Sequence, residues 1–208
     1  MARLGVLGGT FDPPHVGHLI AARDVLDALG LDRLLLVPVG EPPHKPGGAV
    51  APAEVRARML EAAVAGDPRL GVSRVEVDRG GPSYTVETLR ELRDAHPQDE
   101  LHLVIGVDQL EVFDTWRAPE EVARLAKLVV MSREGRDPRQ VAPGVRVPHQ
   151  LVPVTRVDLS SSELRDRIAR GRSIRHRVPD AVLRIIEEEH LYETGAPLPG
   201  AGVGAAGR

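Results

Sequence analysis

The chain has 208 residues, 42% of them hydrophobic, so it is long enough for one sizeable domain and short for two. Its formal net charge of −3 argues against a broad binding surface for duplex nucleic acid. Cysteine is absent, which excludes disulfides, cysteine-ligated zinc and thiol nucleophiles.

The spacing of apolar residues predicts strands that alternate with helices along the chain. Short strands are expected at residues 3–7, 33–37, 70–78, 101–105, 127–131 and 151–155. Helices are expected at residues 17–29, 53–65, 84–95, 161–170 and 180–190. A loop rich in proline and glycine spans 38–52, and the Gly-, Ala- and Pro-rich tail at 194–208 is expected to be disordered. Neither a repeat nor a domain boundary is visible, so residues 1–193 are assigned to a single domain.

The predicted strands are apolar on both faces, which is typical of an α/β protein with a doubly wound parallel sheet covered by helices on each side. Ligands of such sheets bind beyond the carboxyl ends of the strands, near a switch point in strand order. The chemistry is therefore expected in four loops, those after Leu7, Val37 and Ile105 and the one before Ser161.

The first of these loops, GGTFDPPHVGH, combines glycines, a proline turn and two histidines. Gly8 and Gly9 allow the backbone to approach a ligand closely. His15 and His18 fall at the start of a predicted helix, whose free N–H groups and positive dipole end attract phosphate. Two imidazoles at this position could donate hydrogen bonds to phosphate oxygens. Two other interpretations stay open, namely a loop cap beside a surface histidine, and a zinc site completed by His44.

Four further motifs follow in the chain: PVGEPPHK from Pro38, SYTVETL from Ser83, GVDQLEVFDTW from Gly106 and LSSSELR from Leu159. Together with the first loop they resemble the motifs of bacterial nicotinate-nucleotide adenylyltransferases, a branch of the nucleotidyltransferase superfamily with the H-x-G-H motif. The resemblance runs from about residue 3 to residue 192 and implies a Rossmann-like nucleotidyltransferase fold with C-terminal helices. Small departures are the serine at position 162 and the leucine at 164, where many relatives carry Thr and Ile.

The resemblance implies that AMP is transferred from ATP to nicotinate mononucleotide, giving deamido-NAD and pyrophosphate in NAD biosynthesis. The 5′-phosphate of the mononucleotide is already a nucleophile at neutral pH. Catalysis then needs positioning and charge stabilisation rather than a general base or a covalent intermediate. Mg²⁺ is expected to ride on the ATP phosphates, so we expect no dedicated metal site made by the protein.

The resemblance also implies roles for individual residues. Catalysis would use His15, His18 and Lys45. ATP would be bound by Gly8, Gly9, Thr10, Phe11, His18, Gly106, Asp108, Ser160, Ser161, Ser162 and Arg165. Nicotinate mononucleotide would be bound by Tyr84, Thr85, Trp116, Lys45 and Arg133. Trp116 would stack on the nicotinate ring, and the N–H groups of Tyr84 and Thr85 at a helix start could hold the carboxylate and select the acid over the amide.

Several of these residues also have ordinary structural explanations. Ser160 with Glu163 fits a capping box, so a helix is expected to begin there whatever the function. Trp116 could be a packing residue, Asp108 a plain helix cap, and Lys45 a solvated residue of its loop.

Other functions stay open beside this one. The first is another branch of the superfamily, such as pantetheine-phosphate adenylyltransferase, and the second is a nucleotide-binding module without turnover. RNA binding is the third, although the net acidity and the 2% aromatic content count against it. No apolar run approaches the roughly 18 residues of a membrane helix, and the N-terminus lacks a secretory signal pattern. We expect a cytoplasmic protein whose partners are ATP and nicotinate mononucleotide, without nucleic acid or membrane, and leave a homo-oligomer open.

Overall fold

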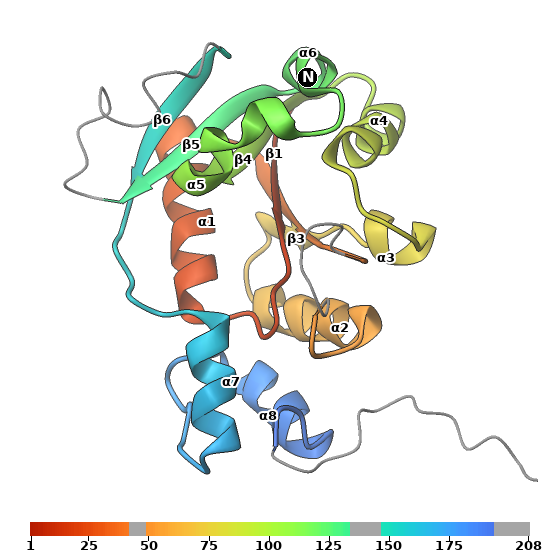
Figure 1. The fold of residues 1–208 in the computed structure, drawn as a ribbon. Coiled ribbons are helices and arrows are strands. Elements are labelled where there is room, and N and C mark those ends of the chain that lie inside the picture. The colour runs from red at the N-terminus through yellow and green to blue at the C-terminus, as the bar shows by residue number, and fades with distance from the viewer. Residues whose placement is uncertain (42–48, 134–146, 194–208) are drawn as a thin grey trace, which may run out of the picture.

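The computed structural model describes residues 1–41, 49–133 and 147–193. Its centre is a sheet of six parallel strands in the order β3-β2-β1-β4-β5-β6 (Figure 1). The strands are β1 (Arg3–Gly9), β2 (Arg33–Pro38), β3 (Leu70–Val72), β4 (Glu100–Gly106), β5 (Lys127–Arg133) and β6 (His149–Val154). The order changes direction between β1 and β4, so the predicted doubly wound parallel sheet, with its switch point, is confirmed.

Helices cover the sheet on both faces. Between the strands lie α1 (Val16–Leu29), α2 (Ala53–Val64), α3 (Val75–Arg79), α4 (Thr85–Ala95), α5 (Val107–Glu111), the 3₁₀ turn η1 (Phe113–Thr115) and α6 (Pro119–Leu125). Side chains of β1 alternate between the faces: Leu4 and Val6 join the core formed with α4, α5 and α6, whereas Leu7 joins the core formed with α1 and α2. This alternation explains why the strands are apolar throughout rather than at every second residue.

A third hydrophobic cluster joins α2 to the C-terminal helices α7 (Ser161–Ala169) and α8 (Asp180–Glu188). Met59 from α2 and Leu164 from α7 are both fully buried in it. In Figure 1, α7 and α8 lie beside α2, at the end of the molecule where the chain leaves β1 and enters α1. The predicted C-terminal helices are therefore present, and they flank the first of the four loops.

The strand predicted at residues 70–78 is wrong beyond Val72, because residues 75–79 form α3. β3 is an edge strand that pairs only with Leu34, Leu35 and Leu36 of β2, and the chain leaves the sheet after this short ladder. The alternating valines of this stretch suggest a strand, but in the helix Val75 packs on the core while the polar Glu76 is buried.

The sequence predicts no helix between β4 and β5, where the structure has α5, η1 and α6. The other predicted elements agree within two residues at each end. None of the helices in the described part of the chain is long and apolar enough to cross a membrane.

Candidate active site

Two cavities open at the carboxyl ends of β1 and β4, where the strand order reverses. The first, about 440 Å³, is named here the tryptophan pocket after Trp116, and it is also lined by Tyr84 and Thr85. The second, about 490 Å³, is named the histidine pocket because His15 and His18 line it. The two share a wall made of Leu7, Gly8, Gly9, Gly106 and Met131. A ligand could therefore span both pockets across the glycines that end β1 and β4.

The histidines are fixed by the start of α1. His15 is the N-cap, and its backbone N–H donates to Nδ1 of His18 at 3.2 Å. The two imidazole rings stack with their centroids 3.7 Å apart, and Phe11 packs edge-on against His18 at 5.0 Å. A Cβ at Gly17 would lie 3.1 Å from Nδ1 of His15, so a side chain at this position would press on the ring. The H-x-G-H spacing thus lets two imidazoles stack in the first helical turn.

Burial keeps both histidines neutral in the free protein. Desolvation lowers the pKa of His15 from 6.5 to about 4. Desolvation, followed by the charge of His15, lowers the pKa of His18 to about 3. Because Nδ1 of His18 accepts a hydrogen bond, the proton of its neutral ring must sit on Nε2. His18 can therefore donate a hydrogen bond from Nε2 to an anion in the pocket.

The start of α7 borders the same pocket. Ser160 caps the helix, since its Oγ accepts from the N–H of Glu163 at 3.1 Å, as the capping box predicts. Ser161 Oγ donates to the carbonyl of Pro13 at 2.9 Å, and Arg165 donates to the carbonyl of Asp12 at 2.7 Å. The start of α7 is thus tied to the turn that precedes the histidines.

A buried arginine, not singled out by the sequence motifs, joins the loops after β1 and β2. Arg56 of α2 is 1% exposed, and its guanidinium donates to the carbonyls of Ala51 (3.1 Å), Thr10 (2.8 Å) and Gly40 (3.0 Å). Each acceptor lies in a loop or turn whose carbonyls the sheet cannot satisfy. Arg56 therefore ties the backbone at Thr10, which lines the tryptophan pocket, to the loop segments at Gly40 and Ala51.

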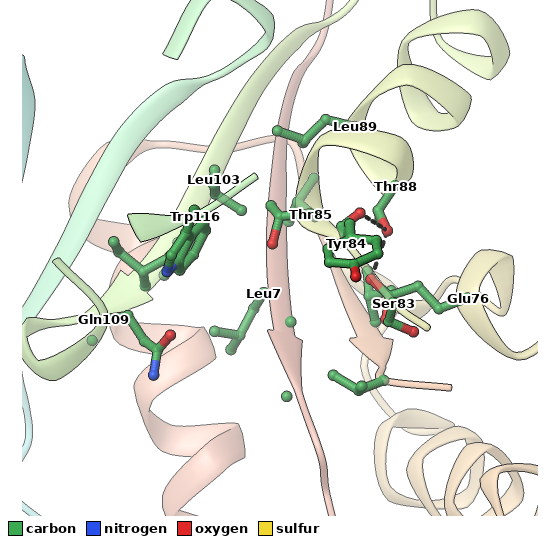
Figure 2. A pocket seen from close by; sticks show the side chains of 18 of the residues that line it. Leu7, Glu76, Ser83, Tyr84, Thr85, Thr88, Leu89, Leu103, Gln109 and Trp116 are labelled. Carbon is green, nitrogen blue, oxygen red and sulfur yellow. Dashed lines mark hydrogen bonds between the residues drawn. The ribbon is translucent and has the colours of Figure 1, made fainter. Parts of the chain in front are cut away.

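The tryptophan pocket has an aromatic wall and a helix start facing each other (Figure 2). Trp116 lies on one side, packed on Phe113 with ring centroids 5.2 Å apart. On the other side Tyr84 is the N-cap of α4 and Thr85 its first residue, so their N–H groups have no partner within the helix. The guanidinium of Arg117 covers the Tyr84 ring at 4.6 Å. The pocket can accept a flat ring with an anionic substituent.

A buried carboxylate is hydrogen-bonded to the first turns of α4. Glu76 of α3, 6% exposed, accepts from Thr88 Oγ1 at 2.6 Å, and both residues line the pocket. Ser83 Oγ accepts from the N–H of Gly40 at 3.1 Å, which ties the end of β2 to the same turn. No motif in the sequence points to Glu76 or Thr88, because only their contact across 12 residues reveals their place in the site.

The structure brings most of the predicted site residues to the two pockets. Thr10 lines the tryptophan pocket, while Phe11, Asp108, Ser160 and Ser161 line the histidine pocket. The remaining predicted residues are placed as follows. Ser162 and Arg165 line neither pocket, and Arg165 donates a hydrogen bond to Ser162 Oγ at 3.2 Å. Lys45 lies outside the described residues. Arg133 ends β5, and only its backbone is described. Gln109 and Arg117 line the tryptophan pocket without having been predicted.

Carboxylates are scarce around the histidine pocket. Asp108 is the one acidic side chain among its described lining residues. Across the ranges that the structure describes, three or more His, Cys, Asp or Glu residues never gather as a metal site would require.

The sheet order and the joined pockets at its switch point place the chain in the class of Rossmann-like α/β proteins that bind ligands at this edge. The family described as cytidylyltransferase-like matches residues 6–167.

Comparison with whole proteins narrows this class. The chain is 48% identical over 190 residues to a Thermus thermophilus protein named "probable nicotinate-nucleotide adenylyltransferase", covering 91% of this chain and 99% of that protein. A Geobacillus thermodenitrificans protein of the same name is 43% identical over 192 residues, covering 92% of this chain and 87% of its own. The structure of Plasmodium falciparum nicotinic acid mononucleotide adenylyltransferase complexed with NaAD shares the fold, with a TM-score of 0.73 at 14% identity over 92% of this chain and 98% of that chain. The chain belongs to the nicotinate-nucleotide adenylyltransferase family and is thus a nucleotidyltransferase, as its motifs predicted.

Proposed function

We propose that the chain transfers the adenylyl group of ATP to nicotinate mononucleotide and releases deamido-NAD and pyrophosphate. The observation that carries this proposal is the shared glycine wall, which lets one pocket hold each substrate with the reacting phosphates meeting at Gly8 and Gly9. Membership of the family supports it.

In the proposed reaction an oxygen of the mononucleotide 5′-phosphate attacks the α-phosphorus of ATP. The new P–O bond forms as the bond from the α-phosphorus to the β-phosphate oxygen breaks, and pyrophosphate leaves with the electron pair. His18, with its proton on Nε2, donates to the α-phosphate as negative charge develops, and His15 stacks against it. The N–H groups at the start of α7 face the leaving phosphates.

The tryptophan pocket takes the nicotinate ring in this proposal. Trp116 stacks on the ring, and the N–H groups of Tyr84 and Thr85 accept its carboxylate at the positive end of α4. The amide analogue carries no negative charge, so it gains less from the helix end. Lys45 and Arg133 stay proposals from the resemblance alone.

Mg²⁺ fits this site as an ion carried by the triphosphate. A hard cation that keeps its waters and takes phosphate oxygens needs few protein ligands. Asp108, the one carboxylate among the described lining residues, is compatible with that demand. When bound, the ion would neutralise part of the charge on the leaving pyrophosphate. Adding a chelator in excess of the metal should abolish turnover, and restoring Mg²⁺ should recover it.

Pyrophosphate release with ATP and a panel of acceptors tests the proposal. The acceptors are nicotinate mononucleotide, nicotinamide mononucleotide, pantetheine phosphate, flavin mononucleotide and glycerol phosphate. We expect release with the first and much slower release with the second. Release with pantetheine phosphate but not with nicotinate mononucleotide would assign the chain to a different reaction.

A further inference from the structure

The last turn of the described chain reaches the loop that precedes the catalytic histidines. The hydroxyl of Tyr192 donates to Oδ1 of Asp12 at 2.8 Å, across 180 residues of sequence. Asp12 is 1% exposed, and its carboxylate also accepts from the N–H groups of Val50 (2.7 Å) and Ala51 (3.2 Å). Burial, and then the charge of Asp12, raise the pKa of Tyr192, so its hydroxyl stays protonated and remains a donor.

The backbone on both sides of Leu191 adopts a conformation that is unfavourable for residues with a Cβ. His190 and Tyr192 have φ angles of 50° and 65°, in the left-handed region that residues with a Cβ rarely occupy. Between them Leu191 is 3% exposed and fills the third hydrophobic cluster. Such a conformation persists only where surrounding contacts determine it. The buried leucine, the backbone hydrogen bonds that His190 and Leu191 donate to α8, and the Tyr192–Asp12 hydrogen bond are contacts that hold it.

Asp12 belongs to a turn that the C-terminal helices hold at several atoms. Arg165 binds its carbonyl, Ser161 binds the next carbonyl, and the N–H of Val16 donates to the carbonyl of Arg177 at 3.0 Å. Arg165 also pairs with Oδ2 of Asp12 at 3.8 Å, but Tyr192 differs from these groups because it donates a hydrogen bond to the Asp12 carboxylate. If Arg165 turns toward a phosphate, the carboxylate remains anchored by Tyr192 and the N–H groups of the opposite loop.

We propose that Tyr192 is a positioning residue for the ATP side of the reaction, because its hydroxyl holds Asp12 and thereby the turn that aims His15 and His18. The proposal rests on the proposed function, which assigns the histidine pocket to the triphosphate. It predicts that KM for nicotinate mononucleotide stays unchanged, since the tryptophan pocket is held separately by the Glu76–Thr88 contact.

Tyr192→Phe tests this role, because it removes one oxygen and keeps the buried ring. We expect kcat/KM for ATP to fall about tenfold, the factor typical of a lost hydrogen bond to a charged group, with KM for nicotinate mononucleotide within about twofold of wild type. Amide hydrogen exchange should quicken in residues 12–18 relative to the later turns of α1. Thermal unfolding of each variant verifies that the protein assayed is folded.

The matched control is Glu189→Gln, three residues away in the same C-terminal segment. It removes the ion pair that Glu189 makes with Arg58 of α2 at 2.6 Å, so it loosens the same segment without reaching Asp12. We expect its kinetics to match wild type. The proposal is overturned if Tyr192→Phe leaves kcat/KM for ATP unchanged, or if KM for nicotinate mononucleotide rises as much as KM for ATP. Absence of pyrophosphate release from wild type would instead overturn the proposed function. In that case the affinities of the two variants for ATP, measured by calorimetry, would still test the role of Tyr192.

Discussion

At the scale of single residues, the two nitrogens of the His18 ring have different roles. Nδ1 accepts from the His15 N–H and holds the ring in place, whereas Nε2 can donate to a ligand. The amide oxygen of asparagine can stand in for Nδ1 as an acceptor, but asparagine has no group at the place of Nε2. His18→Asn should therefore fold normally and lose about a hundredfold or more in kcat, because one donor to the developing charge is gone. Steady-state pyrophosphate release and thermal unfolding measure the two effects. Near-wild-type turnover in a folded variant would remove His18 from the proposed mechanism.

The lowered pKa values of His15 and His18 also predict how the free energy of unfolding depends on pH. Their pKa values are about 4 and 3 in the folded protein against 6.5 when unfolded, so below pH 6.5 the unfolded chain binds protons that the folded chain does not. Stability is then complete above pH 6.5 and falls as the pH drops toward 4, by up to about 1.4 kcal/mol per pH unit for each histidine. His102, whose pKa burial also lowers, adds to the same slope.

Urea unfolding between pH 7 and pH 4.5 checks this slope, with His18→Asn as the comparison. The variant has one histidine fewer to protonate in the unfolded state, so its stability should fall less steeply. Parallel curves for the two proteins would show that His18 is not protonated differently on unfolding.

Residues whose roles are local could be predicted from the sequence, whereas those that act across the fold could not. The Ser160 cap and the paired histidines depend on neighbours three residues away, so their spacing alone indicates the geometry. Arg56 contacts a carbonyl 46 residues distant, and Tyr192 contacts Asp12 across 180. A sequence motif confined to one loop does not indicate partners that lie tens of residues away in the chain.

At the scale of elements, long stretches with a clear apolar period were assigned well and short ones were not. Strands buried on both faces and helices of nine residues or more agree with the prediction. The helices α3 and α5 have only five residues each, too few to display a helical period. Both border the tryptophan pocket, since Glu76 lies on α3 and Gln109 on α5, so the part of the site least visible in sequence lies on the shortest elements.

The start of α4 gives a prediction about substrate selection. Thr85 is the first helical residue, where proline is tolerated, and Tyr84 has the extended backbone (φ −110°, ψ 129°) that a following proline requires. Thr85→Pro should therefore keep the helix but delete one N–H aimed at the proposed carboxylate. We expect kcat/KM for nicotinate mononucleotide to fall about tenfold and the preference over nicotinamide mononucleotide to narrow.

Thr85→Ala is the control, because it removes the same side chain and keeps the N–H. Rates on both mononucleotides, measured for the two variants, separate the backbone from the side chain. If alanine and proline lower the preference equally, the side chain rather than the N–H group makes the selection.

At the scale of the whole molecule, the alternation of strands and helices predicts a parallel sheet and the edge at which ligands bind. The strand order is what brings the four loops together, and it depends on pairings such as Leu4 with Arg33 and Leu101 that no local pattern encodes. Once β1 lies between β2 and β4, the loops after β1 and β4 border the same two cavities, and the start of α7 closes one of them.

This arrangement predicts the kinetic order of the proposed reaction. Two pockets with a common glycine wall allow both substrates to be bound at once, so the adenylyl group can pass directly between phosphates. The chain has no cysteine, and direct attack by a phosphate needs no enzyme nucleophile. Double-reciprocal plots at several fixed mononucleotide concentrations should intersect. Labelled pyrophosphate should enter ATP only when nicotinate mononucleotide or deamido-NAD is present, since no adenylyl-enzyme forms. Parallel lines, together with entry of labelled pyrophosphate into ATP when both the mononucleotide and deamido-NAD are absent, would require a covalent intermediate. Such an intermediate needs a nucleophile, which the shared wall does not provide.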